Sequence, residues 1–316
     1  MLAVTMAALG LSASLAAQLE STAVRALARL ESDEVPGSRL PILKERRYVM
    51  SGAVRPLLFW VGRDDIGLAR IVWRGRADGA RGYELLVGTD PPRAPRRMNR
   101  WGFVSEETLG ASGSVLAIMT GSNETSFQDE ADSAARGASG WDFQTIRSRT
   151  QNGTTRWQLA RVRTPEALTV HQVAAALEHM GNGDSEAKRK QRPVSANVRS
   201  GFLVAVADLV DATVAASRDG ARAPVKDTAV VPYVFGEQTY ELRVRDVDSV
   251  VVTYGGRRIP ALKTSFQTRG LKTGARTRFE LTIGMTPETA GIPIFIEWQP
   301  RWWLKVKLRL QDPEAS

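Results

Sequence analysis

The sequence predicts a mainly β protein of the α+β class. We expect a curved antiparallel meander, barrel- or clam-like, interrupted by a two-helix insertion. Short segments that alternate apolar and polar side chains recur at intervals of about ten residues, which is typical of strands joined by tight turns. Such segments occur on both sides of the middle of the chain, and the middle has helical spacing of its apolar residues instead.

The composition is that of a folded globular protein. Of the 316 residues, 43% are hydrophobic and 24% are charged, which does not favour general disorder. The absence of cysteine excludes disulfides, thiolate metal sites and a cysteine nucleophile. The net charge of +9 is spread along the chain instead of being concentrated in one stripe. We therefore expect no specific recognition of nucleic acid.

Residues 1–17 are predicted to be a secretory signal peptide. Met1 to Leu19 carries no charge and is rich in small and apolar residues, with Ser14-Leu15-Ala16 or Leu15-Ala16-Ala17 as the small-residue cleavage site. A basic region before the apolar run is missing, and an amphipathic helix continuing through Gln18–Leu30 is the alternative. Export predicts a periplasmic or secreted protein that meets a membrane only through this transient signal. Whether the segment is cleaved stays open.

Residues 18–163 form a predicted N-terminal β-rich portion. Two prolines and a glycine in residues 31–45 indicate an extended linker. Alternating or continuously apolar segments then follow between Gly- and Asp-rich turns, and Asn152–Gly153 is a favoured hairpin dipeptide. The predicted strands include Tyr48–Val54, Leu57–Val61, Ala69–Trp73, Tyr83–Val87, Phe143–Arg147 and Arg156–Val162.

Residues 164–218 are predicted to be a helical insertion. Thr164-Pro165 before an apolar stretch and Gly181 after it frame a first helix. A second is predicted over Phe202–Ser217, where one stripe is apolar. The polar connection 181–193 is predicted to be mobile.

Residues 219–316 form a predicted C-terminal antiparallel β-meander. Gly236-Glu237 indicates a hairpin, and a final hairpin covers the stretch from Gly291 to Gln311. In that hairpin Ile292, Ile294, Ile296 and Trp298 share a face, as do Trp302, Leu304, Val306, Leu308 and Leu310. Alternation places Trp303 on the opposite, polar face. Whether the two β portions form one barrel or two domains stays open.

Four carboxylates are the candidate catalytic groups: Asp64, Asp65, Glu106 and Glu107. Paired carboxylates can divide acid and base work in a glycoside hydrolase. Neighbouring residues in one turn usually point apart, however, and Asp favours turns for local reasons. A serine-nucleophile elbow and a phosphate-binding loop are absent, and His171 and His179 lie too far apart in sequence to chelate one ion from adjacent turns. We expect no metal and no cofactor.

Trp60, Trp73, Trp298 and Trp302 are the candidate ligand-binding residues. Aromatic side chains on curved antiparallel strands can enclose one apolar ligand. The alternative is that these indoles fill the core.

Arg93, Arg96, Arg97 and Arg100 are the candidate polyanion-binding residues. They lie in a stretch with three prolines and Trp101, so the alternative is a solvated, extended connection.

Two stretches resemble an uncharacterised family of bacterial periplasmic β-rich proteins, a domain of unknown function. One is Ile66–Ile71 followed by Gly82–Leu85, and the other is Gly291–Glu297 with a final strand that ends at Leu308–Leu310. The resemblance implies a curved antiparallel barrel or clam whose chain ends pair, and a periplasmic location. The family has no assigned reaction. The central helices and the Arg/Pro-rich loop depart from its pattern.

The function expected from the sequence is therefore non-enzymatic. We expect an exported, envelope-associated or binding protein that holds an apolar or amphipathic ligand. The alternatives are a carbohydrate-active hydrolase with paired carboxylates and a polyanion-binding protein. Ligand identity and oligomeric state do not follow from the sequence.

Overall fold

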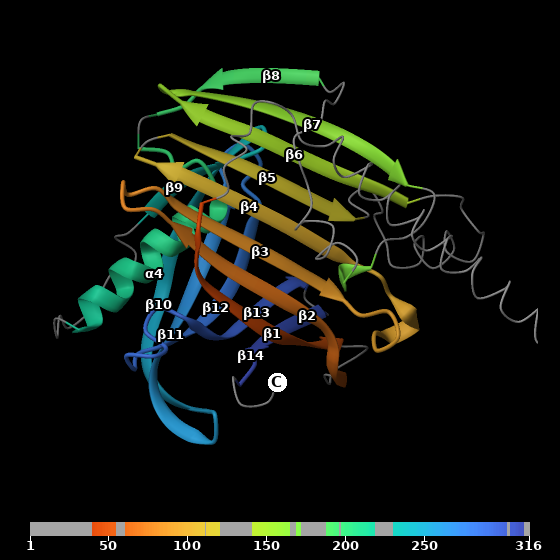
Figure 1. The fold of residues 1–316 in the computed structure, drawn as a ribbon, viewed down its shortest axis with the longest axis vertical. Helices are drawn as coiled ribbons and strands as arrows, with labels where there is room; N and C mark the ends of the chain where they lie inside the picture. The colour runs from red at the N-terminus through yellow and green to blue at the C-terminus, as the bar shows by residue number, and fades with distance from the viewer. Residues whose placement is uncertain are drawn as a thin grey trace, which may run out of the picture.

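The computed structural model describes residues 40–54, 61–110, 112–120, 141–164, 169–171, 188–195, 197–218, 230–301 and 304–312. Antiparallel β-structure dominates these residues, with one long helix, α4, so the predicted fold class is confirmed (Figure 1). The elements are β1 (Ile42–Val54), β2 (Val61–Gly75), β3 (Arg81–Thr89), the 3-10 turn η1 (Pro95–Arg97), β4 (Trp101–Leu109), β5 (Ser112–Thr120), β6 (Trp141–Gln151), β7 (Thr154–Thr164), β8 (Lys188–Pro193), α4 (Phe202–Arg218), β9 (Val230–Phe235), β10 (Gln238–Tyr254), β11 (Arg257–Gly270), β12 (Arg276–Gly284), β13 (Pro293–Arg301) and β14 (Leu304–Leu310).

All strands of the described residues belong to one 14-stranded sheet. Its order is β8-β7-β6-β5-β4-β3-β2-β1-β14-β13-β12-β11-β10-β9, which is two meanders joined where the first strand pairs with the last. At that seam Tyr48 lies opposite Leu310 and Val54 opposite Leu304. The two β-rich portions of the sequence therefore share a single sheet, and the chain ends pair as the family resemblance implies.

The sheet curls until its distant parts meet (Figure 1). A Cβ added at Gly236, in the β9–β10 turn, would lie 3.6 Å from Ile146 Cγ2 of β6, although the two strands stand far apart in the sheet order. The backbone of Arg199, between β8 and α4, bonds to Pro232 O and Val234 N of β9. This segment bridges from the β8 side of the sheet to the β9 edge.

We call the sheet face that carries Glu106 and Phe266 the inner face, because α4 packs against it. The core beside α4 contains Leu209 and Val210 from the helix and residues of β9–β12, among them Leu242 and Ile283. A second cluster on the same face joins β1, β2 and β14 around Tyr48 and includes half-buried residues at the tip of the β10–β11 hairpin. Burial of the alternating apolar set from both meanders explains why the period-two pattern recurs along the chain.

The described elements bear on four of the sequence predictions. The predicted helix over Phe202–Ser217 is confirmed as α4. Only residues 169–171 of the first predicted helix are described, and Val170 and His171 are helical there. Two boundaries were wrong: residues 42–45 of the expected linker belong to β1, and residues 188–193 of the expected mobile connection form β8.

The outer face of the first meander is also partly buried. Leu86 and Phe103 are nearly inaccessible there, and Val170 packs on the same face. A Cβ at Gly88 would lie 2.7 Å from Val170 Cγ2, so this strand position accommodates the 169–171 segment only without a side chain.

Candidate functional site

The first turn of α4 rests on a buried glutamate from β4. Glu106 is fully buried, and its Oε2 accepts a hydrogen bond from the backbone N–H of Val204 at 2.9 Å. The N–H groups of Phe202 and Leu203 are also directed at this carboxyl group. A helix leaves its first amides without partners, and α4 has no acid in its own first turn. Glu106 therefore acts as a cap supplied from another element.

Gly201 makes this contact possible. A Cβ at this position would lie 2.3 Å from the Glu106 carboxylate, closer than any real contact. The neighbouring Ser200 is 4% exposed and crosses over Gly113 of β5. The segment before the helix can therefore approach β4 and β5 closely because both crossing points have a glycine.

Burial raises the pKa of Glu106 to about 7, and the backbone donors of α4 offset part of that effect. Its Oε1 atom is buried and has no hydrogen-bond partner in the described part of the chain, and the same holds for Ser200 Oγ. Polar atoms of this kind are rare in protein interiors. They give the apolar inner face a small polar region at the start of α4.

Two rows of inner-face side chains lead to this point from opposite parts of the sheet. Trp73, Tyr83 and Glu106 are consecutive cross-strand neighbours on β2, β3 and β4. On the second meander, Trp298 lies opposite Phe279, and the Phe279 ring meets that of Phe202 with centroids 5.7 Å apart. Since Phe202 begins α4 beside Glu106, the curl brings both rows to the same end of the helix.

The inner face is not covered uniformly. On the second meander Leu242, Val244 and Phe266 are completely buried beneath α4. On the first meander, Ala69 and Val115 also face inward and are fully buried, but five apolar side chains on β2–β4 are only half-buried; these are Ile71, Trp73, Leu85, Val87 and Val104. Solvent therefore reaches an apolar surface on β2–β4 that faces the inside of the curl.

The predicted tryptophan set is placed only in part. Trp73 is half-buried and packs beside the cluster around Tyr48, whereas Trp298 is 44% exposed. Both lie on the inner face, as their alternation predicts. Trp60, Trp302 and the polar-face candidate Trp303 fall outside the described residues. A ligand-binding role for this set stays a prediction.

The structure does not bring the predicted carboxylates together. Asp65 lies eight residues before Trp73, the β2 residue aligned with Glu106, which corresponds to about 26 Å along a strand. Paired glycosidase carboxylates are separated by less than about 10 Å. Asp64 and Asp65 are exposed, and Asp65 binds Arg93 at 2.6 Å. Glu107 points to the outer face, where its Oε1 accepts a hydrogen bond from the Leu40 N–H.

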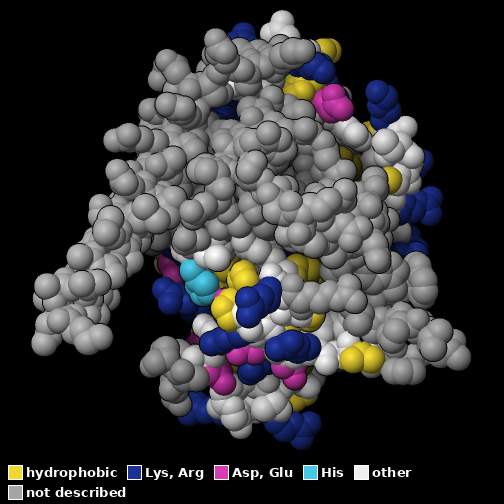
Figure 2. All heavy atoms as spheres, turned by 90° about the vertical axis from the view of Figure 1, so that its right-hand side faces the viewer, with side chains coloured by type: hydrophobic (Ala, Val, Ile, Leu, Met, Phe, Trp, Pro, Cys, Tyr) yellow, Lys and Arg dark blue, Asp and Glu magenta, His cyan; other side chains and the backbone are white. Residues whose placement is uncertain are grey.

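The predicted arginine loop is balanced by acids. Arg93 pairs with Asp65 and with Asp90, whose carboxylate lies 3.4 Å away. Figure 2 shows basic and acidic side chains intermixed on this side of the molecule. Arg97 is exposed with φ 54°, the Arg100 backbone is bonded to Thr89, and the side chain of Arg96 is outside the description. Among the described side chains of this loop, basic residues do not form a continuous surface.

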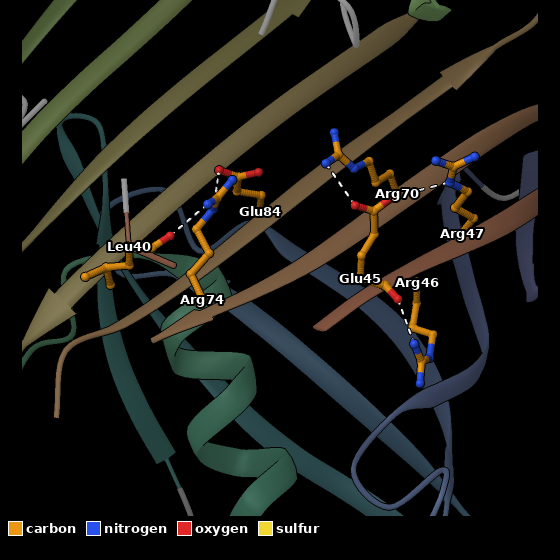
Figure 3. Close-up of polar contacts among 7 residues, drawn as sticks. All are labelled: Leu40, Glu45, Arg46, Arg47, Arg70, Arg74 and Glu84. Atoms are coloured by element: carbon orange, nitrogen blue, oxygen red, sulfur yellow. Dashed lines mark hydrogen bonds and ion pairs between the residues drawn. The ribbon is translucent and has the colours of Figure 1, made fainter. Parts of the chain in front are cut away.

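Ion pairs also occupy the outer face of β1–β3 (Figure 3). Glu45 binds Arg70 at 3.0 Å and Arg47 at 3.3 Å. Arg74 binds Glu84 at 2.8 Å, with both side chains under 10% exposed, and donates to the Leu40 carbonyl. The charges on this part of the sheet are thus compensated within the fold.

Within the described ranges, no group of three or more His, Asp or Glu side chains is arranged to hold a metal ion. His171 is exposed, with its Nε2 3.8 Å from Asp90 Oδ1; His179 lies outside the description. Among the same residues, no helix has the length and apolarity needed to cross a membrane.

The fold of this chain is similar to that of a solved structure, although no family model and no curated protein matches its sequence. The structure is similar to that of a β-barrel-like protein of the domain of unknown function DUF1849 from Brucella abortus, with 8% identity and a TM-score of 0.44 over 87% of this chain and 97% of the other. That protein has no stated activity.

Glu106 was among the predicted residues, but in a different role. The sequence contains one signal for its role as a cap: the helix beginning at Phe202 carries no acid in its first turn, so its free amides need a distant acceptor. Which residue supplies the acceptor depends on the curl of the sheet. Ser200 and Gly201 were missed for the same reason.

Proposed function

We propose that the protein is a non-enzymatic binding protein that holds an apolar or amphipathic ligand on the inner face of β2–β4. The observation that supports this most is a contrast in burial: Leu242, Val244 and Phe266 are completely buried beneath α4, whereas five inward-facing apolar side chains on β2–β4 remain partly accessible to solvent. Apolar surface kept in contact with water inside a fold favours occupation by an apolar group.

The polar groups at the first turn of α4 favour an amphipathic ligand. Glu106 Oε1 and Ser200 Oγ are unpartnered within the described residues, and Trp73 and Trp298 lie along the rows that lead there. A chain lying along β2–β4 would place its polar end near the start of α4, above these buried atoms. The predicted export signal supports binding in the periplasm or outside the cell.

A fluorescent fatty-acid analogue tests the proposal with the full chain. Trp73→Ala should weaken binding about tenfold, because roughly 50 Å² of apolar contact at about 25 cal/mol per Å² is lost. Leu43→Ala is the control, since Leu43 is 69% exposed near the start of β1 and should leave the affinity unchanged. The proposal fails if the parent binds no analogue and organic extraction of the purified protein yields no lipid.

A further inference from the structure

The three strands at one end of the sheet carry a concentration of positive charge that the proposed ligand site does not use. β6, β7 and β8 together contain nine basic residues and one acid, Asp142. The basic residues are Arg147, Arg149, Arg156, Arg161, Arg163, Lys188, Arg189, Lys190 and Arg192. β8 is the terminal strand of the sheet order, so this basic group, which we call the β6–β8 edge, lies at a border of the sheet.

Three of these cations, Arg149, Arg156 and Lys190, are exposed, whereas Arg147 is buried. Arg149 and Arg156 are directly opposite each other on the outer face, and both are exposed. Lys190 is exposed on β8, and the neighbouring Arg192 has buried Nε and Nη2 atoms without a hydrogen-bond partner. Among the residues that the structure describes, neither the three exposed cations nor Arg192 has an acidic partner within ion-pair distance. Like charges directly opposite on adjacent strands are destabilising.

This arrangement differs from that on β1–β3. There Arg70 and Arg74 each bind a carboxylate of the same fold (Figure 3), and Arg93 in the loop after β3 does the same. The repulsion between Arg149 and Arg156 has no such compensation among the described residues. An external anion would supply it, and the fork of the guanidinium group favours phosphate oxygens.

We propose that the β6–β8 edge docks on an anionic phospholipid surface. The cations lie on both faces of the strands: Arg149 and Arg156 point outward, whereas Lys190 and Arg192 are on the inner-face side. When such an edge lies against a membrane, the long cationic side chains on both faces can extend to the same plane of lipid phosphates. This goes beyond the transient membrane contact expected of the export signal.

Nucleic acid fits this geometry less well. Duplex recognition needs the charge on one face or stripe, and single-strand binding needs exposed aromatic rings between the cations. On β6–β8 the aromatic side chain that is described, Trp157, is half-buried and on the inner side. The exposed tip of the β6–β7 hairpin, Asn152-Gly153, adds no ring.

Co-sedimentation of the full chain with lipid vesicles tests the proposal. The parent should bind vesicles of phosphatidylcholine mixed with phosphatidylglycerol at low salt, bind pure phosphatidylcholine more weakly, and lose the difference at about 0.5 M salt. A variant with Arg149→Gln, Arg156→Gln and Lys190→Gln should partition about 100-fold less onto the mixed vesicles, at about 1 kcal/mol per basic residue. Far-ultraviolet circular dichroism confirms that the variant is folded.

A matched triple variant controls for net charge. Arg258→Gln, Lys272→Gln and Arg276→Gln removes the same charge from exposed positions on the second meander and should change partitioning less than about threefold. Equal losses in both triple variants would overturn the proposal, as would equal binding of the parent to both kinds of vesicle. Tighter binding of an oligonucleotide, lost in the first variant alone, would assign the edge to nucleic acid and overturn the membrane assignment.

Discussion

Glu106 links a single ionisation to the stability of the fold. Its pKa is raised from 4.5 to about 7 because burial disfavours the charged form. A carboxyl group with a raised folded pKa contributes stability that is fully present below its unfolded pKa and is lost as pH rises through the folded pKa. The free energy of unfolding should therefore fall between about pH 4.5 and pH 7.

Glu106→Gln removes this ionisation without changing the size of the side chain. Relative to the parent, the variant should gain about 2–3 kcal/mol between pH 5 and pH 8, since each unit of pKa shift corresponds to about 1.4 kcal/mol. Urea unfolding at a series of pH values measures the difference. Glu237→Gln, at an exposed position in the β9–β10 turn, should leave the pH dependence as in the parent. An unchanged slope in Glu106→Gln would contradict the assignment.

At the scale of elements, α4 is held in place by packing as well as by the capping carboxyl group of Glu106 from β4. Leu209 is 2% exposed and lies among the side chains of β9–β12. Leu209→Ala should lower the free energy of unfolding by about 2–5 kcal/mol, because it removes buried methyl groups and leaves a cavity. Chemical denaturation measures the loss.

Leu271→Ala is the control for that substitution. Leu271 is 49% exposed in the turn after β11, so the same chemical change should cost less than about 0.5 kcal/mol. Equal effects at the two positions would show that α4 does not form part of the cooperative core.

The elements differ in how far the sequence predicts them. The strands around Ala69–Trp73 and the helix at Phe202 follow from apolar periodicity, because each buries one face. β8 has no apolar alternation, and its basic residues gave no strand signal; it forms where β7 offers an unpaired edge, so pairing overrides local preference. A local sequence pattern does not show which strand will offer its edge to a given segment.

The candidate site, too, could be predicted from the sequence only in part. Alternation correctly places Trp73 and Trp298 on the inner face. Their convergence on Phe202 depends on the curl of the whole sheet, which joins residues far apart in the sequence. Glu106 bonds to Val204, 98 residues away, and no spacing in the sequence relates the two.

At the scale of the whole molecule, the β1–β14 seam joins the two meanders into one sheet. Tyr48 of β1 is fully buried there, and its hydroxyl donates to the Pro293 carbonyl, 245 residues later, at 2.9 Å. Burial raises the pKa of Tyr48, so the phenol stays neutral and remains a donor. Because the seam is continuous from Tyr48 to Val54, we expect the meanders to unfold together.

Tyr48→Phe tests this coupling by removing the hydrogen bond while keeping the ring. It leaves the Pro293 carbonyl without its donor and should cost about 1–3 kcal/mol. Tryptophan fluorescence and far-ultraviolet circular dichroism should shift to lower denaturant by the same amount, since a single transition carries both signals. Tyr254→Phe is the matched control: its exposed hydroxyl bonds to Gln311 O at 3.3 Å, and its loss should cost less than about 0.5 kcal/mol. Two separated transitions, with only one moved by Tyr48→Phe, would mean that each meander is stable without the seam.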